Sequence, residues 1–249
     1  MKTFGLIGLK LGYSFSKKFF NEKFETEGRT DLQYVNFELD SIAKFPSIFD
    51  MYEEIAGLNC TIPYKQQIMQ YLSEIDEEAK EIGAVNTIKI IHSEQGLRLK
   101  GYNTDIIGFR NSIQPMLTEK HNKALILGTG GASKAIKHVL SKLGIDYVSA
   151  SIEQQLEHNE IRYDDIDAAL LKERLIVINA TPLGTHPNID NCPPIPYDQI
   201  TNEHVMFDLV YNPEVTLFMK KGQEKGAKTK NGLEMLHGQA IASWEIWNA

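Results

Sequence analysis

The stretch Lys123-Ala124-Leu125-Ile126-Leu127-Gly128-Thr129-Gly130-Gly131-Ala132-Ser133 decides the fold. Its first five residues form an apolar run typical of a buried strand, and helical sequence follows its glycines. A glycine turn between a strand and a helix lets backbone N–H groups approach a pyrophosphate, and the helix dipole strengthens the attraction. Because Ser133 replaces the third glycine of a full G-x-G-x-x-G pattern, an ordinary tight turn is the alternative interpretation.

Further apolar runs follow this stretch, at residues 145–149, 175–180 and 205–209. Loop or helix signals come after each of them, which predicts a doubly wound parallel α/β sheet. In such a sheet an acid near the end of the second strand binds the ribose of NAD, and an arginine there suits NADP. Glu153 is the candidate acid, although a loop glutamate is usually a solvated surface charge. The polar residues 158–167 are expected to form a surface loop.

The sequence before the glycine turn predicts a second α/β region. Strands are expected at residues 3–9, 33–39 and 57–61, and helical segments at 42–51, 64–82 and 104–117. Ser16 is the expected N-cap of a first helix that carries Phe20 and Phe24. Two β-rich runs, 85–91 and 97–102, are separated by a hairpin-like connection at 93–96. An apolar stripe from Leu233 to Trp247 predicts a C-terminal amphipathic helix.

Length and charge narrow the classes of function. A chain of 249 residues suits one large domain or two modest ones, at roughly 150 residues per domain. The 26 basic and 33 acidic side chains give a net charge of −7, which lacks the basic footprint of a nucleic-acid-binding protein. We therefore expect a small-molecule ligand.

The sequence also bears on compartment and metal content. No apolar run reaches the roughly 20 residues of a membrane helix, and the N-terminal run is too short for a signal peptide. Cys60 and Cys192 have neither CxxC spacing nor a neighbouring histidine cluster, so no zinc site or disulfide framework is predicted. A cytoplasmic protein without membrane or metal is expected.

Polar residues gather at several predicted element boundaries. Taken singly, each has an ordinary explanation: Asn86 as a turn residue, Asp105 as a helix N-cap or first-turn acid, and Lys65 as a solvated cation. Together they belong to eight motifs in the order and spacing of one family. The motifs are G-Y-S-F-S at 12–16, N-C-T-I-P-Y-K at 59–65, G-A-V-N-T at 83–87, N-T-D at 103–105, G-T-G-G-A-S at 128–133, N-A-T-P-L-G at 179–184, D-L-V-Y-N-P at 208–213 and N-G-L-E-M-L at 231–236. Through them the sequence resembles the shikimate dehydrogenase family.

The resemblance implies two domains and an activity. Residues 1–103 would form a substrate domain completed by a helix at 233–249, and residues 104–232 a Rossmann-like dinucleotide-binding domain. The implied reaction is reversible hydride transfer between NADP(H) and 3-dehydroshikimate or shikimate, a step of aromatic amino acid biosynthesis. A dual quinate/shikimate dehydrogenase with relaxed NAD or NADP use and a non-catalytic metabolite sensor are the alternatives. Either a monomer or a homodimer is compatible with the sequence.

The resemblance also implies site residues. The family's catalytic pair, which contacts the substrate, falls on Lys65 and Asp105. Further substrate-binding positions fall on Ser14, Ser16, Thr61, Asn86, Tyr211 and Gln239. Cofactor-binding positions fall on Gly128, Thr129, Gly130, Gly131, Ala132, Asn179, Thr181, Val210 and Gly232.

The implied pair suits the chemistry. A ring ketone that accepts hydride needs a proton donor at the developing alkoxide, and a lysine side chain, protonated at neutral pH, supplies one. Asp105 would hold the substrate hydroxyl and orient the lysine. Lys65 acts either as the acid and base or as a charged anchor for the alkoxide.

Two features depart from the family pattern. Tyr13 and Lys17 replace a histidine and a proline around the first motif, although both serines are present. The arginine that grips the 2′-phosphate of NADP after the second dinucleotide-domain strand is also missing, and Ala150 or Ser151 stands there. The alternatives are a phosphate contact from Lys134 or Arg162, weaker NADP binding, or use of NAD.

Overall fold

The computed structural model describes residues 1–12, 14–93 and 96–249, so Tyr13 of the first motif and Glu94 and Gln95 of the expected hairpin connection lie outside it. The chain forms two compact units. The first unit comprises Met1–Thr104 and Ala240–Ala249, and the second unit comprises Asp105–Gln239. The chain passes from the first unit to the second after residue 104, whereas the expected boundary follows residue 103. It returns to the first unit at residue 240, within the C-terminal helix, whereas the expected boundary precedes that helix.

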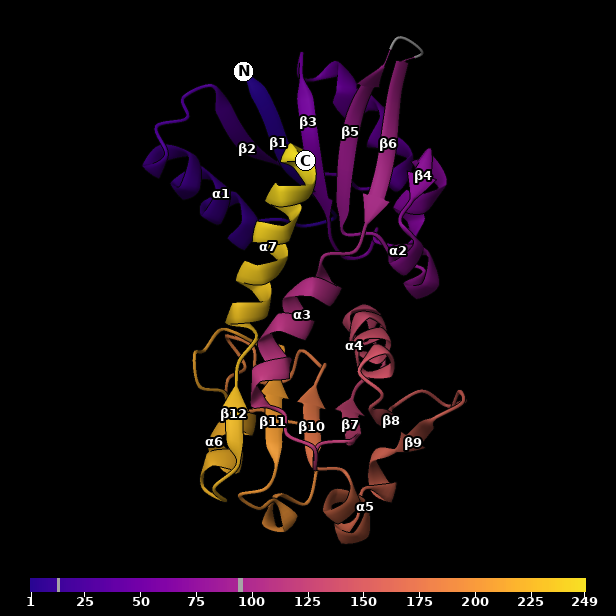
Figure 1. Ribbon diagram of the computed structural model, residues 1–249, viewed down its shortest axis with the longest axis vertical. Helices are drawn as coiled ribbons and strands as arrows, with labels where there is room; N and C mark the ends of the chain where they lie inside the picture. The colour runs from indigo at the N-terminus through magenta and orange to yellow at the C-terminus, as the bar shows by residue number, and fades with distance from the viewer. Residues whose placement is uncertain (13, 94–95) are drawn as a thin grey trace. The chain divides into compact units, whose positions relative to one another are not determined.

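The first unit contains a mixed sheet in the order β2-β1-β3-β5-β6-β4 (Figure 1). Its strands are β1 (Lys2–Gly8), β2 (Leu32–Glu38), β3 (Ile55–Cys60), β4 (Glu74–Ile75), β5 (Thr87–Ser93) and β6 (Gly96–Tyr102). Its helices are α1 (Phe15–Thr26), η1 (Ile42–Asp50), η2 (Gln67–Tyr71) and α2 (Glu77–Ile82), with the end of α7 (Leu233–Asn248). β1 pairs in parallel with β2 and β3, whereas β5 is antiparallel to β3 and β6.

Three local predictions need correction. The segment 64–82, expected to be helical, contains the strand β4 between η2 and α2. The N-cap of α1 is Ser14, whose Oγ accepts the Lys17 N–H at 3.1 Å, and Ser16 lies inside the helix. Either serine satisfies the cap preference, so the sequence pattern selects the wrong one. The segment 42–50 is a 3-10 helix, and Pro46 inside it lacks the N–H that a continuous α-helix needs.

Side chains from both faces of the first sheet are buried. On one face, α1 and α7 pack an aromatic cluster against β1 and β2, in which Phe20 stacks on Tyr34 with ring centroids 4.7 Å apart. The Trp247 ring lies 5.0 Å from that of Phe4, and its indole N–H donates to the Ile88 carbonyl at 3.0 Å. These contacts anchor the last turns of α7 on the first unit.

The second unit contains a six-stranded sheet in the order β12-β11-β10-β7-β8-β9, and every pairing in it is parallel. Its strands are β7 (Lys123–Leu127), β8 (Asp146–Ser151), β9 (Glu160–Arg162), β10 (Ile176–Asn179), β11 (Val205–Asp208) and β12 (Lys228–Lys230). Its helices are α3 (Asp105–Ile113), η3 (Gln114–Met116), α4 (Gly131–Lys142), η4 (Tyr163–Asp165), α5 (Ala168–Glu173), η5 (Tyr197–Gln199), α6 (Leu217–Gln223) and the start of α7. The predicted doubly wound α/β architecture is confirmed.

Two strands of this sheet, β9 and β12, are absent from the sequence prediction. β9 lies within the polar segment expected to be a surface loop, and it pairs with β8 along Ser149–Ser151. A three-residue edge strand carries too few apolar positions for an alternating pattern to reveal it.

The following two absences apply to residues 1–12, 14–93 and 96–249. No helix there combines the length and the apolar character needed to cross a bilayer. No group of three or more histidine, cysteine or acidic side chains there is placed to hold a metal ion.

Candidate active site

The glycine turn lies at the carboxyl edge of the second sheet, between β7 and α4. Gly128 has a φ of +98°, and a Cβ there would lie 2.8 Å from Thr181 Cγ2, so the position requires glycine. By contrast, a Cβ at Gly130 or Gly131 would meet nothing within 4 Å. The backbone here thus faces open space, and the first N–H groups of a helix have no intrahelical partners. The turn therefore fits a pyrophosphate, as the sequence predicts.

Ser133 fits the place of the third glycine. Its hydroxyl donates to the Gly130 carbonyl at 2.6 Å, and its backbone N–H donates to the same oxygen at 2.9 Å. The side chain is buried, so its only polar atom is satisfied inside the first turn of α4. The serine consequently closes the turn without projecting toward a bound ligand.

The ends of β10 and β11 are joined through Asp208. Its Oδ1 accepts from Asn179 Nδ2 at 2.9 Å and from the Val210 N–H at 3.0 Å, and its Oδ2 accepts from Thr216 Oγ1 at 2.5 Å. Burial raises the pKa of Asp208 to about 6, and these three donors oppose the shift. The sequence gives no signal for this network, because only the parallel pairing of β10 with β11 brings Asn179 beside Asp208.

Asn179 organises the loop after β10. Its Oδ1 accepts from the Thr181 N–H at 3.0 Å and from Thr181 Oγ1 at 2.6 Å, while Thr181 Oγ1 accepts from the Leu183 N–H at 3.2 Å. Asn179 is fully buried, whereas Thr181 is partly exposed. Asn179 is therefore a positioning residue, and Thr181 is the member of the pair that a ligand could reach.

Gly232 and Tyr211 flank the end of β11. A Cβ at Gly232 would lie 2.2 Å from the Leu209 carbonyl, so only glycine allows the two backbone segments to approach this closely. Gly232 also donates its N–H to the Val210 carbonyl at 3.2 Å. Tyr211, by contrast, is 36% exposed. This places an accessible phenol directly after the buried Val210.

In the first unit, Asn86 is the centre of a buried polar network. Its Oδ1 accepts the Thr104 N–H at 2.7 Å and the hydroxyls of Thr104 and Thr87 at 3.1 Å each. Asn59 Nδ2 extends the network to Thr87 Oγ1 at 3.1 Å and to Ser243 Oγ at 2.9 Å. The interpretation of Asn86 as a simple turn residue misses these bonds. Thr104 and Ser243 join it from distant parts of the chain.

Lys65 follows β3 in a turn rather than at the start of a helix. The Thr61 N–H donates to the Ile7 carbonyl at 2.9 Å, and the Val85 N–H donates to the Lys65 carbonyl at 2.7 Å. The hydroxyl of Tyr64 is anchored on the Leu39 carbonyl at 2.6 Å. Backbone bonds thus fix Lys65 on both sides while its side chain stays half-buried.

The remaining predicted residues lie at helix positions. Ser14 and Ser16 lie at the start of α1 in the first unit, and Asp105 is a first-turn acid of α3 in the second, one of its two expected roles. Gln239, also in the second unit, donates to the Leu236 carbonyl at 3.0 Å. The first unit therefore carries Ser14, Ser16, Thr61, Lys65 and Asn86, and the second carries Asp105, Tyr211, Gln239 and all nine predicted cofactor residues.

Comparison with known proteins decides the family. A family model described as the shikimate dehydrogenase substrate binding domain matches residues 6–88. Over 99% of its length the chain is 38% identical to the shikimate dehydrogenase (NADP(+)) of Methanococcus aeolicus, and the match covers 91% of that relative. The chain belongs to the shikimate dehydrogenase family.

Solved structures of the family have the same fold. Shikimate 5-dehydrogenase from Listeria monocytogenes, in complex with shikimate and NAD, matches with a TM-score of 0.87 and 25% identity, over all of this chain and 92% of that one. Quinate dehydrogenase from Corynebacterium glutamicum, in complex with NAD, matches with a TM-score of 0.85 and 25% identity, over 98% and 93% of the two chains. The predicted family is confirmed over nearly the whole chain.

The end of β8, next to the glycine turn, is where this shikimate dehydrogenase family member lacks the arginine of the family pattern. Ala150 and Ser151, at the position of the missing arginine, are 0% and 2% exposed. Ser151 Oγ lies 3.3 Å from Thr129 Oγ1 and accepts the Glu153 N–H at 3.2 Å. The side chain accessible here is Ile152, which is 85% exposed. An arginine side chain at 150 or 151 would therefore disrupt the packing of the sheet edge.

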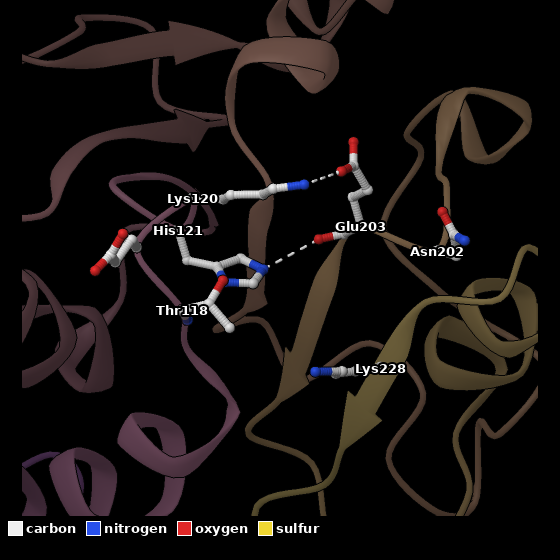
Figure 2. Close-up of a pocket in the computed structure, with 7 residues that line it drawn as sticks. Thr118, Lys120, His121, Asn202, Glu203 and Lys228 are labelled. Atoms are coloured by element: carbon white, nitrogen blue, oxygen red, sulfur yellow. Dashed lines mark hydrogen bonds and ion pairs between the residues drawn. The ribbon is translucent and has the colours of Figure 1, made fainter.

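A hollow of about 520 Å³ lies at the opposite, amino-terminal edge of the same sheet (Figure 2). Two of its side chains contact Glu203: Lys120 Nζ lies 2.7 Å from Glu203 Oε1, and His121 Nε2 donates to the Glu203 carbonyl at 3.0 Å. In doubly wound sheets ligands bind at the carboxyl ends of the strands. We therefore place no part of the family's active site in this hollow.

Proposed function

We propose that this chain is an NADP-dependent shikimate dehydrogenase that reduces 3-dehydroshikimate to shikimate and catalyses the reverse oxidation. The supporting observation is the presence of Lys65 and Asp105 together with an open glycine turn in a chain 38% identical to an NADP(+)-dependent relative. The substrate is a small carboxylic acid and the cofactor is NADP. Through this reaction the enzyme serves aromatic amino acid biosynthesis.

The first unit supplies groups suited to a polyhydroxylated acid. Ser14 and Ser16 lie at the start of α1, where the helix dipole favours a carboxylate. Thr61 and Asn86 offer a hydroxyl and an amide to ring hydroxyls, and the three hydrogen bonds to Asn86 Oδ1 fix the orientation of that amide. The substrate would thus meet oriented polar groups.

Lys65 and Asp105 carry the proton chemistry. In the reducing direction, the Lys65 ammonium donates a proton to, or stabilises, the alkoxide that forms from the ketone. In the oxidising direction, a neutral lysine accepts the proton of the substrate hydroxyl. Asp105 would bind the same substrate hydroxyl and orient it for the transfer.

The second unit holds the cofactor. NADP supplies the hydride in one direction and accepts it in the other. The turn from Gly128 to Ala132 receives the pyrophosphate, while Thr181, Val210 and Gly232 border the sheet edge beyond it. Asn179 and Asp208 keep that border in place.

Nicotinamide absorbance measured with shikimate or quinate, each against NADP+ and NAD+, tests the proposal. Turnover of shikimate with NADP+ is expected. Quinate turnover would instead favour the dual-specificity enzyme, which the similarity to quinate dehydrogenase keeps as the second candidate. Folded protein that binds shikimate but turns over neither substrate would be a metabolite sensor and would overturn the proposal.

A further inference from the structure

We propose that Arg162 recognises the 2′-phosphate of NADP in this chain and determines its preference over NAD. The inference rests on the proposed function and names the residue that replaces the missing arginine. In dinucleotide-binding sheets, the group that selects between the two cofactors lies at the carboxyl end of the strand following the glycine turn. That strand is β8 here, and its last residues carry no charge.

Strand pairing brings Arg162 to this edge. β9 lies parallel to β8 with Arg162 opposite Ser151, and Ser151 in turn is beside Thr129 of the glycine turn. Only residues 152–159 connect the two strands, and they contain no helix. Parallel strands are usually joined by a dozen or more residues, most often through a helix. The short connection thus keeps an arginine of the next strand close to the end of β8.

The Arg162 guanidinium is held in place by the loop that follows β8. Its two terminal nitrogens donate to the carbonyls of Glu153 and Gln154. A guanidinium carries five N–H groups, so these two bonds leave others for a ligand. Since both carbonyls lie just beyond the strand end, the cation is fixed near where the adenosine ribose binds in this fold.

The partners that the structure gives the Arg162 guanidinium are backbone carbonyls. In residues 1–12, 14–93 and 96–249, no carboxylate forms an ion pair with it. Lys137 on α4, by contrast, pairs with Glu160 of β9 at 3.4 Å. The Asp165 carboxylate accepts the Arg162 backbone N–H at 2.9 Å, and the exposed Glu153 contributes its backbone carbonyl to the guanidinium. A half-buried guanidinium in a fixed orientation suits a phosphate dianion. NAD has no 2′-phosphate, so it gains nothing from this contact.

Binding of adenosine 2′,5′-diphosphate and of adenosine 5′-phosphate, measured by calorimetry, tests the assignment without any turnover. We compare Arg162→Gln with Lys134→Gln, which removes the other candidate cation near the start of α4, and with Lys172→Gln. Lys172 is exposed on α5 and lines a hollow at the opposite edge, so its substitution controls for net charge.

Arg162→Gln is expected to weaken binding of the diphosphate by about ten- to a hundredfold and to leave binding of the monophosphate unchanged. The two control variants should bind both nucleotides as the wild type does. Equal losses for both nucleotides would mean that Arg162 only shapes the loop, and would overturn the assignment. So would a selective loss in Lys134→Gln, or a wild type that binds both nucleotides alike.

Arg162→Lys covers the case in which the glutamine variant does not fold. This variant keeps the positive charge but lacks the planar guanidinium, so its preference for the diphosphate over the monophosphate should lie between those of the wild type and Arg162→Gln. An unchanged preference would contradict the proposal. Turnover of shikimate is scored separately. A wild type that prefers the diphosphate but lacks turnover would reject the proposed function and leave Arg162 in its role.

Discussion

Asn86 Oδ1 accepts the backbone N–H of Thr104 at 2.7 Å, which fixes the backbone directly before Asp105. Replacing Asn86 with alanine leaves the buried Thr104 N–H without this acceptor and removes one partner each from the Thr104 and Thr87 hydroxyls, which still contact Ser243. We expect the free energy of unfolding to fall by about 1–3 kcal/mol and the KM for shikimate to rise. Denaturant titration and steady-state kinetics measure the two effects. Asn202→Ala, at an exposed position, should change neither, and an Asn86 variant of wild-type stability would refute the network's role.

Lys65→Ala should lower kcat about 100- to 10,000-fold, because it removes the group that moves the proton. The fold should survive, since the bond from the Val85 N–H goes to the Lys65 backbone carbonyl and not to its side chain. Single-turnover kinetics together with circular dichroism test this. Lys18→Ala, on the exposed side of α1, is the control. A Lys65 variant with nearly normal kcat would remove Lys65 from the catalytic pair.

Asp208 should make the second unit less stable as pH rises through the acid range. Burial raises its pKa from 3.8 to about 6, so the folded state binds the proton more tightly than the unfolded state does. This contribution is complete below pH 3.8 and is lost as pH rises through about 6. Unfolding followed by circular dichroism should show this dependence in the wild type and not in Asp208→Asn. Asp198→Asn, exposed at η5, should keep it, and identical pH profiles for all three proteins would contradict the prediction.

The titration of His204 should make the protein less stable as pH falls, the opposite of the effect of Asp208. Burial lowers its pKa below 6.5, and its Nδ1 accepts the Thr201 N–H at 3.0 Å, which a protonated ring could not do. Its titratable neighbours are Glu203 and His121. The stability that neutral His204 contributes is therefore present above pH 6.5 and is lost as pH falls through its lowered pKa. Relative to His204→Gln, the wild type should lose free energy of unfolding on acidification, whereas a constant difference between the two proteins would argue against this.

Ile152→Arg should strengthen NADP binding about two- to fivefold, as expected for one added ion pair at an exposed position. Ile152 is 85% exposed at the end of β8, whereas the neighbouring Ala150 and Ser151 are buried. Calorimetry with NADP+ measures the change, and Ile152→Gln separates charge from the loss of an apolar side chain. If the arginine and glutamine variants bind alike, this edge does not face the 2′-phosphate.

Local sequence patterns predicted β7, its glycine turn and the parallel strands beyond it, because strand, turn and helix signals there agree. They placed the α1 cap on Ser16 instead of Ser14 because the two serines are chemically equivalent. They missed β9 because its three residues carry too few apolar positions, and they missed the Asp208 network because it depends on pairing between β10 and β11. Assignment of Lys65 and Asp105 to a catalytic pair required the family resemblance, since neither stands out from its neighbours by residue type.

The aromatic cluster that α7 forms with β1 also allows unfolding of the first unit to be followed by tryptophan fluorescence. Both tryptophans of the chain, Trp244 and Trp247, belong to the first unit and pack against the ring of Phe4. Intrinsic tryptophan emission therefore reports the environment of the first unit, while the second unit contributes only tyrosine signal. Comparing emission with far-ultraviolet dichroism during denaturation would reveal whether the two units melt together or one after the other.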